Sequence, residues 1–140
     1  RMLSHPHLYQ QLASGEAGTS TVTDQIEKDL RRTDVGSGVG RVDELRRVLC
    51  AFARYNPTVS YVQGMNFIAS GLLATLTEEG AFWVLSLVVQ NYLPEHFCHD
   101  MVGNHVDGHV LGRRVAEQLP PVGARMDALD VSCQASHGIP

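Results

Sequence analysis

The stretch that decides the fold is NPTVSYVQGMNFIASGLLATL, which runs from Asn56 to Leu76. Its opening Asn56-Pro57 pair ends a preceding helix, because proline lacks an amide proton and disfavours a helical residue before it. Behind Gln63, apolar residues recur at helical spacing, at Met65, Ile68, Leu72 and Leu76. This spacing predicts a buried helix that begins directly after the glutamine, so that one side-chain amide is held at the start of a packed helix.

Helical patterns lie on both sides of this stretch. Upstream, Thr23 or Asp24 is expected to cap a short helix that ends near Thr33 and packs through Val22, Ile26 and Leu30. A clear amphipathic helix is predicted over residues 42–55, with the side chains of Arg46 and Arg47 on its solvated face. Its apolar face is expected to consist of Leu45, Val48, Leu49 and Phe52.

Downstream, Thr77 is expected to cap a helix that is apolar over most of its circumference, and therefore buried, up to Pro94. Weaker apolar spacing predicts two more helices, over residues 104–119 and 122–129, with Pro120-Pro121 as the stop between them. A β-strand pattern is absent from the sequence. The predicted fold class is therefore all-α.

Composition limits the possible functions. The chain has 140 residues, 44% of them hydrophobic, and a net charge of −4 without a basic run, so nucleic acid is not an expected partner. Its apolar runs are much shorter than the roughly 18 residues of a membrane span, so a transmembrane segment is not expected either. Three cysteines without framework spacing favour a reducing, cytoplasmic compartment.

Two motifs resemble those of one known family. Tyr61-Val62-Gln63-Gly64-Met65-Asn66 is similar to the glutamine-finger motif of the TBC domain, the catalytic module of Rab GTPase-activating proteins. Upstream, Ile26-Glu27-Lys28-Asp29-Leu30-Arg31-Arg32-Thr33 resembles the arginine-finger motif of that family. Each motif alone is weak evidence. Their order, with an amphipathic helix between them, makes the resemblance specific.

The resemblance implies a mechanism and a partner. Arg32 and Gln63 would be the catalytic residues, inserted into a GTP-loaded Rab-type small GTPase to speed its GTP hydrolysis in vesicle trafficking. Further positions of the two motifs would support them, namely Ile26, Asp29, Thr33, Tyr61, Gly64 and Asn66. No cofactor of the chain's own and no metal site are expected, since GTP and Mg²⁺ belong to the partner. Peripheral recruitment to endomembranes would come through the Rab.

The resemblance also implies a domain organisation. TBC domains have two helical lobes, and this chain is expected to hold the N-terminal lobe with the second lobe largely absent, as a fragment or truncated copy. We expect a loop-rich lead-in over residues 1–22, a partial TBC domain over residues 23–130 and an unstructured tail over residues 131–140.

Three other interpretations stay open. A truncated lobe could bind a Rab, or another protein, without activating it. The cluster of His96, Cys98, His99, His105 and His109 could ligate zinc in a metal-dependent hydrolase, although it lacks a compact ligand motif, and Cys98 beside His99 is a poor nucleophile pair. The glycine cluster of residues 34–40 could cradle a phosphate, but it follows a helix rather than a strand and is expected to be a connector.

Overall fold

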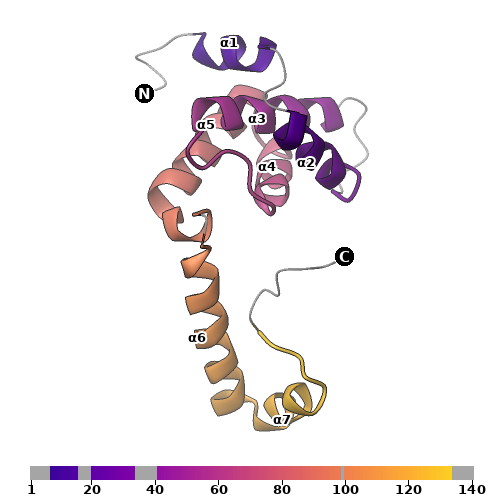
Figure 1. Cartoon of the computed structure of the whole chain (residues 1–140), viewed down its shortest axis with the longest axis vertical. Coiled ribbons are helices and arrows are strands. Elements are labelled where there is room, and N and C mark those ends of the chain that lie inside the picture. The colour runs from indigo at the N-terminus through magenta and orange to yellow at the C-terminus, as the bar shows by residue number, and fades with distance from the viewer. Residues whose placement is uncertain (1–6, 16–19, 34–40, 99, 134–140) are drawn as a thin grey trace. The chain divides into compact units, whose positions relative to one another are not determined.

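The computed structural model describes residues 7–15, 20–33, 41–98 and 100–133. Regular structure within these ranges is entirely helical, which confirms the predicted all-α fold class (Figure 1). The chain forms two compact units, an N-terminal unit of residues 1–92 and a C-terminal unit of residues 93–140.

The N-terminal unit is organised around one central helix. Its helices are α1 (Leu8–Ser14), α2 (Ser20–Leu30), α3 (Arg41–Tyr55), α4 (Met65–Leu73) and α5 (Glu78–Leu87). Helix α3 packs against each of the other four. Its predicted apolar face is completely buried, with 0% exposure at Leu45, Val48, Leu49 and Phe52. The amphipathic pattern over residues 42–55 therefore predicted the central helix of this unit.

Helix α5 supplies an aromatic cluster to the same core. The Phe82 ring lies 5.3 Å from that of Tyr9 on α1 and 5.4 Å from that of Tyr55 on α3. The hydroxyl of Thr77 accepts a hydrogen bond from the Gly80 amide at 3.2 Å, which confirms Thr77 as the N-cap. The helix continues as a π-helix, η2 (Val88–Tyr92). The prediction that this helix is buried over most of its circumference is wrong at Leu87 and Tyr92, whose side chains are exposed.

The predicted loop-rich lead-in is wrong for residues 8–14, which form helix α1. The helix ends at Ser14, directly before Gly15, which is its C-cap. Tyr9 is buried, and its contact with the aromatic cluster gives the short helix a tertiary anchor that its sequence does not show. Helix α2 likewise begins at Ser20, ahead of the predicted cap at Thr23 or Asp24. The helix thus takes in one more turn before Ile26, whose side chain is buried.

Helix α4 begins after Gln63 as predicted, but its buried face is not the predicted stripe. The buried apolar side chains are Met65, Ala69 and Leu73, whereas Leu76 lies beyond the helix and is exposed. Alanine is small enough to let α4 approach its neighbours α3 and α5 closely. Periodicity therefore predicted the helix but not which of its faces is buried.

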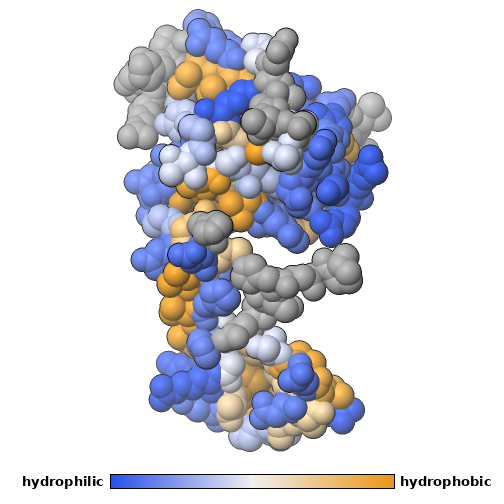
Figure 2. Space-filling model, in the orientation of Figure 1, coloured by the Kyte–Doolittle hydropathy of each residue, from blue (hydrophilic) through white to orange (hydrophobic). Residues whose placement is uncertain are grey.

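The C-terminal unit contains a short 3₁₀-helix, η3 (Pro94–His96), and two helices, α6 (Val102–Gln118) and α7 (Pro120–Ala128). Helices α6 and α7 confirm the two predicted downstream helices, and Pro120 both ends the first and opens the second. Several apolar side chains of this unit are exposed, and Figure 2 shows apolar surface over α6 and α7. On α6 they include Val102, Val106, Val110 and Leu111.

Two predicted segments fall outside the described ranges, namely the glycine cluster of residues 34–40 and residues 134–140 of the predicted tail. Residues 131–133 are described and are not helical. In the part of the chain that the structure covers, every helix is too short or too polar to cross a lipid bilayer.

Candidate functional site

Arg32 lies just beyond the C-terminal end of α2 and is held there by a buried carboxylate. Its Nη2 atom donates to Oδ1 of Asp29 at 2.6 Å. The Arg32 side chain is 51% exposed, whereas that of Asp29 is only 2% exposed. The guanidinium is therefore anchored by Asp29 on one side and exposed to solvent on the other. In this arrangement it can contact an anion on another molecule.

Asp29 is the centre of a wider set of hydrogen bonds. Its second carboxylate oxygen, Oδ2, accepts from the hydroxyl of Tyr61 at 2.7 Å, and from the amide of Gln25 at a longer 3.4 Å. A buried carboxylate is tolerated only when such donors compensate for its lost hydration. Burial, and then the hydrogen bond to Asp29, raise the pKa of Tyr61 well above its ordinary value. The phenol therefore stays protonated and continues to donate.

Gln63 lies on the turn between α3 and α4 with its side chain exposed. The next residue, Gly64, is the N-cap of α4 and has a φ of 102°. Glycine is needed here because a side chain would strain a backbone in this region. The turn is thus fixed by backbone conformation immediately beside the glutamine.

A buried amide ties this turn to the end of α2. Asn66, which is 2% exposed, accepts from the Gly64 amide at 3.0 Å and donates to the hydroxyl of Thr33 at 2.7 Å. Thr33 Oγ1 in turn donates to the backbone carbonyl of Asp29 at 2.6 Å. One continuous set of hydrogen bonds therefore runs from the residue after Gln63 to the residue after Arg32.

The structure brings all the predicted supporting residues into one neighbourhood. Ile26, at 1% exposure, anchors α2 to the core, and the polar members form the hydrogen bonds described above. Sequence reasoning missed Gln25, whose position four residues before Asp29 on the same helix was the available signal. The geometry places every motif residue, while their roles in a reaction remain a proposal.

The prediction that Arg46 and Arg47 only face solvent is wrong. Arg46 bonds Glu27 of α2 as well as Asp43, and Arg47 bonds Glu78 at the start of α5 at 2.8 Å. Arg47 is the main cause of the lowered pKa of Glu78. These pairs join α3 to α2 and to α5, and are best explained as contacts that hold helices together.

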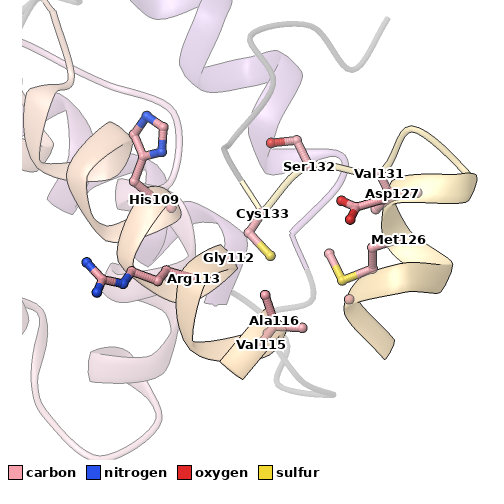
Figure 3. A pocket seen from close by; sticks show the side chains of 12 residues that line it. His109, Gly112, Arg113, Val115, Ala116, Met126, Asp127, Val131, Ser132 and Cys133 are labelled. Atoms are coloured by element: carbon pink, nitrogen blue, oxygen red, sulfur yellow. The ribbon is translucent and has the colours of Figure 1, made fainter. Parts of the chain in front are cut away.

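The histidine cluster does not assemble into a metal site in the described residues. Among them, no three His, Cys, Asp or Glu side chains come together as metal ligands do, and His99 lies outside them. His96 instead pairs with Asp107, Nε2 to Oδ2, at 2.8 Å. Cys133 lies between α6 and α7 in a pocket of about 460 Å³, which His109 also lines (Figure 3).

An all-α scaffold that presents an exposed arginine and an exposed glutamine on one hydrogen-bonded frame fits a module that acts on a partner molecule. The sequence model of the Rab-GTPase-TBC domain matches residues 4–137. The chain therefore belongs to the Rab-GTPase-TBC domain family.

Curated relatives agree with this assignment. The chain is 39% identical to human growth hormone-regulated TBC protein 1 over 139 residues, which cover 94% of this chain and 41% of the relative. It is 38% identical to human TBC1 domain family member 2A over 133 residues, which cover 89% of this chain and 14% of that relative. It is 40% identical to the GTPase-activating protein GYP3 of Saccharomyces cerevisiae over 110 residues, which cover 71% of this chain and 17% of that relative. The chain thus spans less than half the length of each of these relatives.

Proposed function

We propose that this chain accelerates GTP hydrolysis on a Rab-type small GTPase by supplying Arg32 and Gln63 in trans. The partner is the GTP-loaded form, which carries its own Mg²⁺, and the chain contributes no cofactor. It acts in the cytoplasm, in vesicle trafficking, and reaches endomembranes through the bound GTPase. Membership of the Rab-GTPase-TBC family and the similarity to a named GTPase-activating protein support this class of activity.

The chemistry explains why these two residue types are needed. Negative charge is spread over the γ-phosphate oxygens in the transition state, and an arginine supplied by a partner protein stabilises it by about 10³–10⁵-fold in rate. A glutamine amide can orient the attacking water, because it offers both donors and an acceptor. Arg32 would take the first role and Gln63 the second.

One observation carries the proposal: two exposed side chains are held by a single buried frame. A surface Asp–Arg pair is ordinarily worth at most about 1 kcal/mol and has no need of a buried carboxylate. Here Asp29 is buried, bonded by Tyr61 from the turn, and leaves half of Arg32 exposed. The buried carboxylate and its donors orient one guanidinium, as expected for a residue that acts on a partner.

The arginine is tested by single-turnover phosphate release over a panel of GTP-loaded Rab proteins. Arg32→Ala should lower the stimulated rate by roughly 10³-fold or more. Arg31→Ala is the matched control, because the neighbouring arginine is exposed but is not bonded to Asp29. Arg32→Lys should not restore activity, since an ammonium lacks the planar fork. If Arg31→Ala and Arg32→Ala lower the rate equally, the assignment of the arginine finger to Arg32 is wrong.

The glutamine is tested with a Rab whose own catalytic glutamine has been replaced. That Rab should still be activated by the parent chain, because Gln63 would orient the water. Gln63→Ala should abolish the activation while binding of a Rab loaded with a GTP analogue stays near its original strength, as expected for an interaction made mainly in the transition state. Unchanged hydrolysis with Gln63→Ala would exclude the dual-finger mechanism. Binding without activation by any variant or parent would favour a non-catalytic interaction module.

A further inference from the structure

Asn66 is a buried polar residue whose side chain bonds two separate backbone segments. A side-chain amide can accept at one end and donate at the other, in one plane and at a fixed separation. Asn66 uses both ends: Oδ1 accepts from the Gly64 amide and Nδ2 donates to Thr33 Oγ1. Its place in the second position of α4, inside a helix packed on α3, fixes this plane relative to the core.

Each end of the Asn66 amide acts next to one of the two exposed side chains. The Gly64 amide belongs to the peptide group that Gln63 begins, so a bond to it fixes the plane of that peptide and the direction of the Gln63 backbone. At the other end, the Thr33 hydroxyl bonds the Asp29 carbonyl, which also accepts from the Arg32 amide at 3.1 Å. The last turn of α2 is thereby closed directly at Arg32.

A second bridge flanks Gln63 on its other side. Tyr61, two residues before Gln63, bonds the Asp29 carboxylate, and Asn66, three residues after it, bonds Thr33. Both bridges end within the five residues from Asp29 to Thr33. One hydrogen bond would hold the turn at a single point, about which the turn could still pivot. Two hydrogen bonds, one on each side of Gln63, restrict this pivoting.

We propose that Asn66 is a positioning residue that couples the Gln63 turn to the Arg32 end of α2 through Thr33. The coupling sets both side chains for the same phosphate before a partner binds, so that little ordering remains at the moment of reaction. This inference rests on the proposed function, and its structural part can be measured without it. A buried asparagine that only satisfies hydrogen bonds would affect the stability of the fold. It would not affect how Arg32 and Gln63 act together.

The structural part is tested by amide hydrogen exchange, followed by NMR on the full chain without any GTPase. In the parent, the Gly64 amide should be protected by its bond to Asn66. Asn66→Ala should speed its exchange by about tenfold, the change expected for one hydrogen bond of ordinary net strength. The amide of Leu49, buried in α3, exchanges through global unfolding and reports the loss of overall stability in the same sample. Unchanged exchange at Gly64 would overturn the coupling.

The functional part is tested by single-turnover hydrolysis at increasing concentrations of the chain. Asn66→Ala and Thr33→Val should each lower the maximal rate by roughly 10–100-fold, the cost of a misplaced catalytic group, with the half-saturating concentration changed less than about twofold. Thr33→Ser keeps the hydroxyl and should restore the rate. A raised half-saturating concentration at an unchanged maximal rate would overturn positioning in favour of docking.

A mutant cycle decides whether Asn66 acts through Gln63. The cycle uses a Rab that keeps its own catalytic glutamine, so that Gln63→Ala leaves a residual rate to measure. In that background, the Asn66→Ala change should cost clearly less than in the parent, because one of the two side chains that it positions is gone. The same fold loss in both backgrounds would overturn the proposal. If the parent activates no GTPase, the proposed function fails, and the exchange rate of the Gly64 amide alone then supports or overturns the coupling.

Discussion

The two units of this chain bury their side chains in different ways. In the N-terminal unit, large side chains such as Phe52 and Phe82 have no exposed surface, and α3 contacts four other helices. In the described part of the C-terminal unit, the buried positions are Phe97 and glycines of α6 and α7, while valines along α6 are about half exposed. The first unit has a core built from large side chains, and the second has a close contact between two helix backbones.

This difference explains where a precise site can be placed. The hydrogen bonds around Asp29 and Asn66 need partners held within a few tenths of an ångström, and only a densely packed core supplies that rigidity. All the motif residues lie in the N-terminal unit, whose core surrounds α3. In the C-terminal unit, the pocket of Figure 3 is lined by helices that share little buried apolar surface.

The largest expected effect follows from the core of the N-terminal unit. Phe52→Ala removes a fully buried ring from the face of α3 and should lower the free energy of unfolding by about 3–5 kcal/mol. Val110→Ala is the matched change in α6, where the side chain is 54% exposed, and should stay within about 0.5 kcal/mol. Urea unfolding followed by fluorescence of Trp83, the chain's one tryptophan, measures the N-terminal unit.

Far-ultraviolet circular dichroism measures the helices of both units in the same titration. A loss below 1 kcal/mol for Phe52→Ala, or a comparable loss for Val110→Ala, would contradict the contrast between the two cores.

The second prediction concerns the helix contact in the C-terminal unit. A Cβ atom added at Gly123 of α7 would lie 3.2 Å from the Cα atom of Ala116 on α6, which is backbone and cannot easily move. Gly123→Ala should therefore destabilise this unit by about 1–3 kcal/mol. The loss should appear in circular dichroism and leave the Trp83 transition in place. A shift of both signals together would mean that the two units unfold as one.

The fold class was predictable because helical periodicity is strong in α3, where one face is apolar and the other charged. The family resemblance also pointed to residues that the fold brings together, since Asp29, Thr33, Tyr61 and Asn66 all join the hydrogen-bonded frame, while their roles stay a prediction. What the sequence did not reveal depends on tertiary contacts. Helix α1 is anchored by Tyr9, whose ring packs on Phe82 and whose hydroxyl bonds Glu78. Helix α4 buries Met65, Ala69 and Leu73 rather than the predicted stripe.

Longer-range pairings were also out of reach of the sequence. Arg47 and Glu78 are 31 residues apart, and no local pattern indicates that a charge on α3 will meet the first turn of α5. The same holds for Asn66 and Thr33, which are 33 residues apart. Their motif positions suggested a supporting role, but which atoms they join is a property of the folded chain.

The third prediction uses pH to test the buried frame. The pKa values of Tyr61 and Tyr9 are raised in the folded chain, mainly by burial. Above about pH 10, the unfolded chain loses these protons while the folded chain keeps them, so stability is fully present below pH 10 and falls as pH rises beyond it. The slope should approach about 1.4 kcal/mol per pH unit for each tyrosine.

Replacing one tyrosine separates the two contributions. Tyr61→Phe should make the alkaline loss of stability shallower, although the variant is less stable at neutral pH because Asp29 loses a donor. Tyr9→Phe is the matched variant, since its hydroxyl bonds Glu78 at 2.7 Å on another part of the same unit. The measurement is urea unfolding between pH 8 and 11, and an unchanged slope in Tyr61→Phe would show that its phenol is not protected.

The smallest expected effect is that of a glycine substitution in the N-terminal unit, Gly71→Ala. Gly71 of α4 is exposed, and a Cβ atom added there would meet nothing within 4 Å, in contrast to Gly123. Its φ is not positive, so alanine fits the helix without strain. Gly71→Ala should therefore stabilise the N-terminal unit by about 0.5–1 kcal/mol, because it reduces the conformational entropy of the unfolded chain. The Trp83 transition should move to higher urea. Position 71 points away from the core, so the substitution should leave the amide exchange rate of Gly64 as it is in the parent. If Gly71→Ala instead destabilises the unit, the face of α4 that carries residue 71 is covered in solution.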